Sequence, residues 1–314
     1  MPRVRASTFN RAAFALTGLL MLSGCGSSGM SDMGDYLWGS GKSSDSSSSS
    51  SQALAKSGDA IAPDMTAADD TKPIAELYNK GLDALKNGNY STANKSFAEV
   101  ERQHPYSSWA TRAILMQAYV QYSRNAYDDA VAASNRFITL HPGHKDIAYA
   151  YYLLALCHYE QIRDVGRDQT STTKALEAMD EVSRRFPDTP YARDAAAKAV
   201  LARDHLAGKE MAIGRWYQKR HAYLAAINRF KTVIMNYQTT TQTPEALYRL
   251  VELYLALGVV SEAQTAAAVL GHNYPNSDWY KDAYSQLQGR GLSPQANPES
   301  WIARAIKSIN PFSG

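Results

Sequence analysis

A repeated alanine, followed at a fixed distance by a helix-breaking residue, constrains the fold of this chain more than any other feature. Twelve residues after each of five alanines the chain reaches a proline or, in one case, Gln238. A proline cannot continue a helix, so each of these positions predicts the end of a helical segment. The alanines are Ala93, Ala130, Ala175, Ala226 and Ala263, and the prolines are Pro105, Pro142, Pro187 and Pro275.

Mostly apolar residues follow each alanine at helical spacing. The residues four positions on are Phe97, Ser134, Met179, Phe230 and Ala267, and those seven positions on are Val100, Phe137, Val182, Val233 and Leu270. Residues at this spacing lie on the same helix face as the alanine and bury it against a neighbour. We therefore expect each alanine at the crossing of two helices, where only a small side chain lets the backbones approach.

The alanines are separated by 37, 45, 51 and 37 residues, which is a stretched version of the tetratricopeptide period of 34. We predict an all-α, tetratricopeptide-like α-solenoid of about five helical hairpins with a C-terminal capping helix. The expected hairpins are 74–87 with 90–103, 109–124 with 126–140, 145–161 with 172–185, 191–218 with 222–237 and 244–257 with 261–273, and the cap is 279–286.

The first residues of the chain predict export and a lipid anchor. Basic residues precede the apolar run 12–22, which is too short to span a bilayer comfortably and is typical of a signal segment. The run leads into Leu22-Ser23-Gly24-Cys25, which resembles a bacterial lipobox, so Cys25 is expected to carry a covalent lipid. An ordinary signal peptide with a chance cysteine is the alternative.

Composition then divides the chain. Residues 1–24 are expected to be the signal peptide and 25–72 a lipidated cysteine with a disordered serine-rich tether. Residues 73–190 and 191–288 are expected to be the two halves of the repeat. Residues 289–314 are expected to be a flexible tail with a short amphipathic helix at 299–309. That helix docks on the last hairpin or, alternatively, contacts a partner or a membrane surface.

Charge and cysteine content exclude several classes. The chain has 33 basic and 30 acidic residues, and three of the basic ones are in the signal segment. The remaining chain is neutral, which argues against nucleic acid as a partner. Cys157 has no partner if Cys25 is acylated, so no disulfide framework is expected. No metal site, phosphate loop or nucleophile elbow is recognisable, and we expect neither an enzyme nor a cofactor beyond the lipid on Cys25.

Three segments are more specific than a generic repeat. They are LAGKEMAIGRWYQKR at 206–220 continued by YLAAINRF at 223–230, RDQT at 167–170, and FPDTPY at 186–191. They resemble the BamD family of outer-membrane assembly factor lipoproteins, and the resemblance covers about residues 74–286. The serine-rich tether and the tail after residue 289 follow no motif of that family.

The resemblance implies a scaffold of the β-barrel assembly (BAM) complex, held at the outer membrane by lipid and facing the periplasm. Its partners would be the insertase BamA through its periplasmic domains, other BAM lipoproteins and unfolded outer-membrane proteins. The C-terminal half would dock the insertase. The expected contacts are Glu210, Tyr217, Arg220 and Arg229. Alternatively, Glu210 forms a simple ion pair with Arg220 or Arg229.

The N-terminal half is expected to hold the substrate groove. Six tyrosines and one arginine recur at positions that face the concave side of such repeats, and tyrosine suits an interaction surface because it combines apolar area with a hydroxyl. These residues are Tyr78, Arg112, Tyr119, Tyr122, Tyr149, Tyr152 and Tyr159. The alternative is that several tyrosines pack between adjacent hairpins.

Two other functional classes contain helical repeats of this kind. A different periplasmic repeat adaptor, in cell-envelope or peptidoglycan coordination, fits the same fold and is the alternative function. An enzyme with a helical solenoid, such as a murein lytic transglycosylase, needs a catalytic domain beyond the repeats. Only 28 residues follow Gln286, which is too few for a second core.

Overall fold

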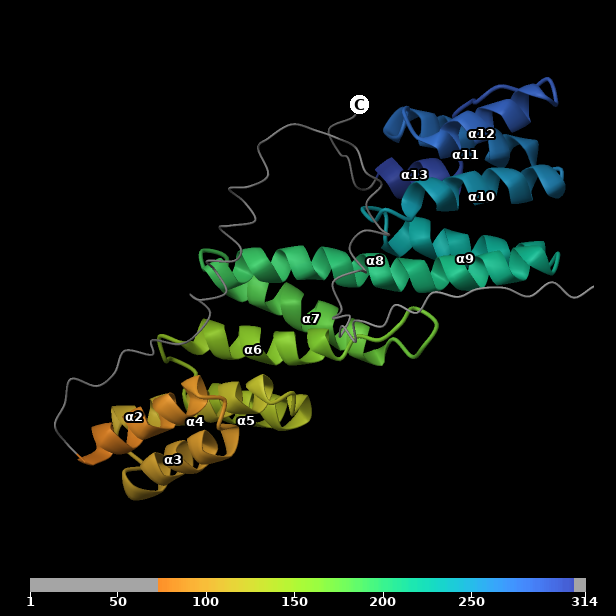
Figure 1. Cartoon of the computed structure of the whole chain (residues 1–314). Helices are drawn as coiled ribbons and strands as arrows, with labels where there is room; N and C mark the ends of the chain where they lie inside the picture. Colours follow the sequence, from red (N-terminus) through yellow and green to blue (C-terminus); the bar gives the residue numbers. More distant parts are fainter. Residues whose placement is uncertain (1–72, 308–314) are drawn as a thin grey trace, which may run out of the picture. The chain divides into compact units, whose positions relative to one another are not determined.

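The computed structural model describes residues 73–307, and these form helices, turns and loops with no strand among them. The predicted signal segment, lipidated Cys25 and serine-rich tether lie outside the described residues, as do residues 308–314. Helix numbering follows Figure 1 and begins at α2. No helix within the described part is long and apolar enough to cross a membrane.

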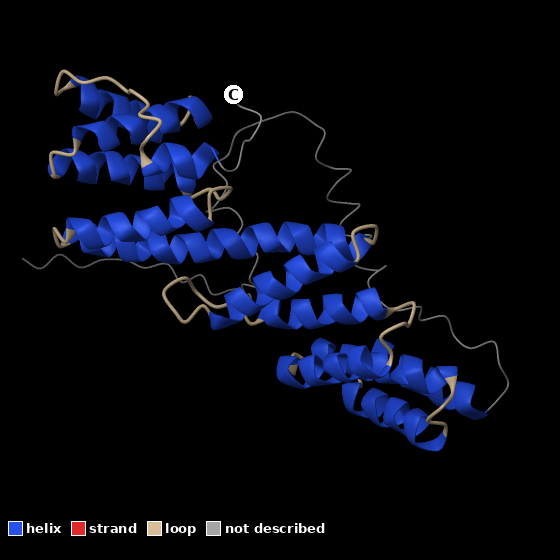
Figure 2. Cartoon of the chain, turned by 180° about the vertical axis from the view of Figure 1, so that it is seen from behind, coloured by secondary structure: helices blue, strands red, loops and turns tan. Residues whose placement is uncertain are grey.

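The described helices are arranged in consecutive antiparallel pairs, as Figures 1 and 2 show. They are α2 (Pro73–Lys86), α3 (Tyr90–Gln103), α4 (Ser108–Ser123), α5 (Tyr127–Leu140), α6 (Ile147–Glu160), α7 (Thr170–Arg185), α8 (Pro190–Lys219), α9 (Tyr223–Asn236), α10 (Thr243–Ala256), α11 (Val260–Asn273), α12 (Asp278–Gln288) and α13 (Trp301–Lys307). Five hairpins and a capping helix are present, so the predicted all-α repeat architecture is confirmed.

The five repeated alanines lie in the core of the hairpins. All five are fully buried, each in the second helix of its pair. The residues four and seven positions further on are buried as well, as the helical spacing requires. The repeated alanines therefore mark the positions where the second helix of each hairpin is buried in the core.

Glycines on the first helices of two hairpins complete the close packing. A Cβ atom on Gly81 of α2 would lie 2.7 Å from Phe97 of α3, and one on Gly214 of α8 would lie 2.5 Å from Phe230 of α9. Both phenylalanines are fully buried. The aromatic ring four residues after the alanine thus fills the space that the glycine leaves open.

Helix ends follow from capping residues and prolines. The side chains of Asn89, Ser107, Thr189 and Ser277 accept a hydrogen bond from a backbone N–H of the first turn that follows. Helix α3 ends at Gln103, two residues before Pro105, because the residue before a proline avoids the helical conformation. All predicted ends of α2 to α12 agree with the structure within two residues. The starts of α6 and α7, at Ile147 and Thr170, and the end of α12, at Gln288, differ by two.

The segment after α12 is docked rather than flexible, which corrects the expected flexible tail as far as residue 307. The backbone N–H of Gln295 donates to Gln264 O at 3.3 Å, and Asn297 N–H donates to Thr265 Oγ1 at 3.1 Å. Helix α13 then packs on α11 and α9, with Ile302 fully buried. An amphipathic helix this short is not stable alone, so its order comes from docking.

Candidate functional site

The seven residues expected to line a substrate groove divide into two groups. Tyr78, Tyr149 and Tyr152 are each about 1% exposed and belong to the core. Arg112, Tyr119, Tyr122 and Tyr159 are half-buried. The expectation that Tyr78, Tyr149 and Tyr152 present a surface is therefore wrong, and the alternative that several tyrosines pack between hairpins holds for these three.

Helix-to-helix packing explains the burial of the three tyrosines. Tyr78 of α2 packs against Phe97 and Trp109, at ring separations of 5.4 and 5.1 Å. Tyr149 and Tyr152 of α6 pack against Tyr191 of α8, at 5.6 and 5.4 Å. These tyrosines therefore join the first hairpin to the second and the third to the fourth.

A partly buried polar junction connects α6 to α8. The Tyr152 hydroxyl donates a short hydrogen bond to the Asp194 carboxylate, which also pairs with Lys198 Nζ at 2.7 Å. Lys198 Nζ lies 5.8 Å from the centre of the Tyr159 ring. Burial, followed by the hydrogen bond to Asp194, raises the pKa of Tyr152 well above its ordinary value. The junction is structural, because every member already has a partner.

Tyr122 is at the centre of the predicted groove residues that are only half-buried. Its ring stacks on Tyr119 at 6.4 Å and contacts Tyr127 at 5.9 Å, and its hydroxyl donates to Glu160 at 3.5 Å. Burial, with the nearby Glu160 carboxylate, raises the pKa of Tyr122. These rings come from α4 and α5, so two helices of one hairpin contribute to the surface.

A hollow of about 730 Å³ adjoins this surface where α6 ends. Its lining includes Tyr127, Glu160 and the cations Arg163 and Arg167 of the α6–α7 loop. The loop is held on α8, because Lys209 Nζ donates to the carbonyl oxygens of Gly166 and Arg167 at 2.9 and 3.3 Å. This loop lengthens the spacing between Ala130 and Ala175 to 45 residues, and that longer spacing was the signal for it in the sequence.

In the C-terminal half, Glu210 and Arg229 form an ion pair. Arg229 Nη1 of α9 lies 3.1 Å from Glu210 Oε2 of α8, with the Arg229 side chain 42% exposed. Arg229 and Tyr217 also line one shallow hollow of about 300 Å³. Three of the four predicted contacts are thereby brought together on the α8–α9 hairpin.

Arg220 stands apart from that pair. Its guanidinium lies 3.9 Å from the centre of the Trp216 ring, and Trp216 packs edge-on against Tyr217 at 4.9 Å. Trp216 is half exposed and was missed as a site residue, although its spacing of four residues from Arg220 places both on one helix face. The ion pair expected as an alternative therefore forms with Arg229 and not with Arg220.

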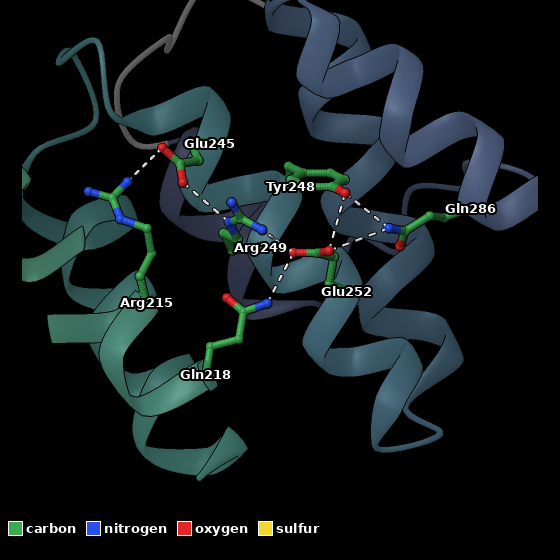
Figure 3. A network of polar contacts seen from close by, with 7 residues as sticks. All are labelled: Arg215, Gln218, Glu245, Tyr248, Arg249, Glu252 and Gln286. Atoms are coloured by element: carbon green, nitrogen blue, oxygen red, sulfur yellow. Dashed lines mark hydrogen bonds and ion pairs between the residues drawn. The ribbon is translucent and has the colours of Figure 1, made fainter. Parts of the chain in front are cut away.

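A network of polar contacts joins α8, α10 and α12 (Figure 3). Arg215 Nη1 of α8 lies 2.8 Å from Glu245 of α10, which also pairs with Arg249 at 3.2 Å. Glu252 accepts hydrogen bonds from Arg249, Gln218, Tyr248 and Gln286 at 2.8 to 3.5 Å. Burial, followed by the charge of the Glu252 carboxylate, raises the pKa of Tyr248 to about 12. The network fixes the fifth hairpin and the cap relative to α8.

Residues 73–307 contain neither a cluster of metal ligands nor a reactive thiol. No group of three or more His, Cys, Asp or Glu side chains that could hold a metal ion occurs there. Cys157 is fully buried in α6, and burial raises the pKa of its thiol to about 12, so the nucleophilic thiolate is suppressed.

These features define a tetratricopeptide-type helical repeat protein with the character of a scaffold: stacked hairpins that present aromatic and charged side chains. The chain belongs to the YfiO family of outer membrane lipoproteins, whose family model matches residues 70–270. That match contains the α8–α9 hairpin and the half-buried tyrosines.

Relatives with the name outer membrane protein assembly factor BamD include proteins of three bacterial genera. The protein of Caulobacter vibrioides is 52% identical over 72% of this chain and 74% of its own length. That of Rickettsia prowazekii is 50% identical over 68% of this chain and 84% of its own, and that of Neisseria meningitidis serogroup A is 35% identical over 67% and 83%. A solved repeat protein of Thermus thermophilus matches 68% of this chain and 99% of its own at 19% identity and a TM-score of 0.33, so the fold is assigned from the hairpins themselves.

Proposed function

We propose that this chain is a lipid-anchored scaffold of the β-barrel assembly machinery, facing the periplasm and taking part in the insertion of β-barrel proteins into the outer membrane. The observation that carries the proposal is the identity of about half of the aligned residues with two relatives named as assembly factors. The matched family is described as an outer membrane lipoprotein.

The α8–α9 hairpin is the proposed docking surface for the insertase BamA. Glu210, Tyr217, Arg220 and Arg229 all lie on this hairpin, and two of the four line one hollow. Tyrosine, tryptophan and arginine are the side chains that contribute most to protein–protein affinity. Arg229 pairs through Nη1 with the partly exposed carboxylate of Glu210, and a guanidinium has five N–H donors, so donors remain for a partner.

Unfolded outer-membrane proteins are proposed to bind the N-terminal half. The half-buried rings of Tyr119, Tyr122 and Tyr159 supply the surface, together with Arg112. The other lipoproteins of the complex are further proposed partners, and the covalent lipid on Cys25 is the proposed attachment to the membrane. No catalytic step and no nucleic acid is part of this function.

Crosslinking in intact cells tests the docking surface. A photoreactive amino acid at position 229 or 220 is expected to form adducts with the β-barrel insertase. The matched control is position 95, because Lys95 is exposed on α3 in the other half of the repeat. Absence of insertase adducts from 210, 217, 220 and 229 alike would contradict the proposal, and capture of peptidoglycan or division proteins instead would favour the alternative adaptor role.

A pair of substitutions separates partner docking from simple ion pairing. Arg229→Ala and Arg203→Ala each remove a surface ion pair between neighbouring helices, the second one to Asp180. Both are expected to change the free energy of unfolding by at most about 1 kcal/mol, since such pairs are solvent-exposed. Only Arg229→Ala is expected to reduce co-purification of the insertase from detergent-solubilised membranes. Equal co-purification by both variants would leave the Glu210–Arg229 pair as a purely structural contact.

A further inference from the structure

The C-terminal hairpins expose apolar side chains at one end. The α8–α9 turn, the α10–α11 turn and the chain that follows α12 lie at the same end of these helices in both views (Figures 1 and 2). We call residues 216–224, 256–260 and 288–292 the turn edge. Each segment contains one residue in the left-handed region, namely His221, Gly258 and Gly291 at φ of 58°, 74° and 71°.

Large apolar side chains of the turn edge reach solvent. Leu224 is 70% exposed and Trp216 49%, and three aliphatic residues of the α10–α11 turn are 37 to 41% exposed. Those three are Leu257, Val259 and Val260. Apolar side chains gathered at one end of a molecule mark an interaction surface more often than scattered ones.

The backbone of the turns does not require these side chains. The α2–α3 turn contains Asn87-Gly88-Asn89, and Gly88 has a φ of 71°, close to that of Gly258. The same turn is thus made with polar flanks in the first hairpin and with Leu257 and Val259 in the fifth. The apolar character of the fifth hairpin's turn is therefore a property of its surface and not of its geometry.

The charges of the turn edge have one sign. Its three segments contain Lys219, Arg220 and Arg290 and no Asp or Glu. Arg220 lies over the Trp216 ring, and Arg290 Nη1 donates to Leu255 O at 3.0 Å, which places the third segment beside the end of α10. Tryptophan, aliphatic tips and basic residues together are the composition of surfaces that lie at a membrane–water boundary.

We infer that the turn edge is a contact surface for an anionic phospholipid layer. The exposed apolar groups lie in two separate turns or in the helix ends next to them, so they can enter between headgroups, while the basic residues beside them face the phosphates. This contact goes beyond the proposed scaffold function, because its partner is the lipid layer. The turn edge includes Tyr217 and Arg220 of the proposed insertase surface, whereas its exposed residues Leu224, Leu257 and Val259 are not part of that surface. The contact is also distinct from the lipid on Cys25, since it is made by side chains of hairpins four and five.

The test measures the depth of one turn in the bilayer. The full-length protein carrying Leu257→Cys is labelled with an environment-sensitive fluorophore and reconstituted into vesicles that contain nitroxide-labelled lipid. The matched control is Asn87→Cys, on the equivalent turn of the first hairpin. The parent chain without an added cysteine gives the background, and Cys157 adds little because it is buried.

We expect quenching at position 257 in vesicles of phosphatidylethanolamine with phosphatidylglycerol, weaker quenching in phosphatidylcholine, and none at position 87. Arg220→Gln is expected to weaken partitioning of the edge roughly five-fold, the effect of one basic residue near an anionic surface. Leu224→Asp with Val259→Asp is expected to abolish the quenching without loss of helicity, since both side chains are exposed.

Two results would overturn the inference. Quenching at position 257 no stronger than at position 87 would show that the turn edge does not enter the bilayer. If a photoreactive group at 257 instead captures a protein in intact cells while the fluorophore at 257 stays unquenched, the turn edge is a protein interface.

Discussion

Gly214 of α8 lies against the ring of Phe230 of α9 so closely that a Cβ atom at position 214 would be 2.5 Å from Phe230 Cε1. Phe230 is fully buried and is four residues after the repeated Ala226. The close approach of the two helices therefore depends on a small residue in both of them, and it sets the geometry of the hairpin that carries the proposed insertase contacts.

Gly214→Ala is expected to lower the free energy of unfolding by about 1–3 kcal/mol, the usual cost of overpacking a close-packed core. Gly208→Ala is the control in the same helix, because its nearest neighbour would be Val165 at 3.8 Å. Replacing a helical glycine that has room for a methyl group is expected to raise stability by about 0.5–1 kcal/mol. Urea denaturation measures both, and a gain in stability for both variants would contradict the tight contact.

Tyr152 and Tyr159 of α6 are expected to respond differently to truncation. Tyr152→Ala removes a buried ring and leaves the Asp194 carboxylate without one of its donors, so it is expected to cost about 3–5 kcal/mol. Tyr159→Ala removes a half-buried ring and is expected to cost much less. Thermal unfolding compares the two, and similar losses would mean that Tyr159 is also a core residue.

This difference decides which tyrosines should be substituted to test peptide binding in the groove. A double substitution of Tyr119 and Tyr152 would confuse unfolding with loss of binding, because Tyr152 belongs to the core. Tyr122 and Tyr159 are the better pair, since both are half-buried.

The fold was predictable from the sequence because its signal is periodic. An alanine, the apolar residues four and seven positions on and a helix stop twelve positions on report local geometry that repeats five times. Exposure of the tyrosines was not predictable in the same way. A residue on the inner face of a first helix meets either solvent or the next hairpin, and Tyr191 of the long helix α8 covers Tyr149 and Tyr152. These contacts join residues about 40 positions apart, so no periodic pattern in the sequence indicates them.

The stability of the first two hairpins is expected to depend on pH through Glu101. Arg136 Nη1 of α5 donates to Glu101 Oε2 of α3 at 3.1 Å, and this bond lowers the pKa of the Glu101 carboxyl from its ordinary value. Since the folded-state pKa is the lower one, the contribution is complete above the unfolded pKa of about 4.3 and is lost as the pH falls through the folded value.

A double-mutant cycle of Glu101→Gln and Arg136→Gln measures that contribution. At pH 7 the coupling energy is expected to be about 0.2–1 kcal/mol, because both side chains are partly exposed. It is expected to vanish in denaturation experiments well below pH 4, as the carboxyl becomes protonated. A coupling energy that is constant over this range would show that the pair contributes through packing rather than through charge.

The segment after α12 is expected to be a separately undocking element. Its anchor is Ile302, which is fully buried, and Trp301 Nε1–H donates to the Tyr254 hydroxyl at 3.0 Å. Ile302→Ala truncates the fully buried side chain of α13, whereas Arg304→Ala changes an exposed residue of the same helix. Because a short terminal helix can open without unfolding the hairpins, the Ile302→Ala effect is expected mainly in local opening.

Hydrogen exchange separates local opening from global unfolding. In Ile302→Ala the amides of residues 301–307 are expected to lose protection by about 30-fold or more, which corresponds to at least 2 kcal/mol of lost docking free energy. The amides of α10 and α11 are expected to change much less, because their core contains Leu247, Leu250 and Leu270 besides Ile302. Equal protection of residues 301–307 in the Ile302→Ala and Arg304→Ala variants would mean that the hydrogen bonds to Gln264 and Thr265, and not the apolar contact, hold the segment in place.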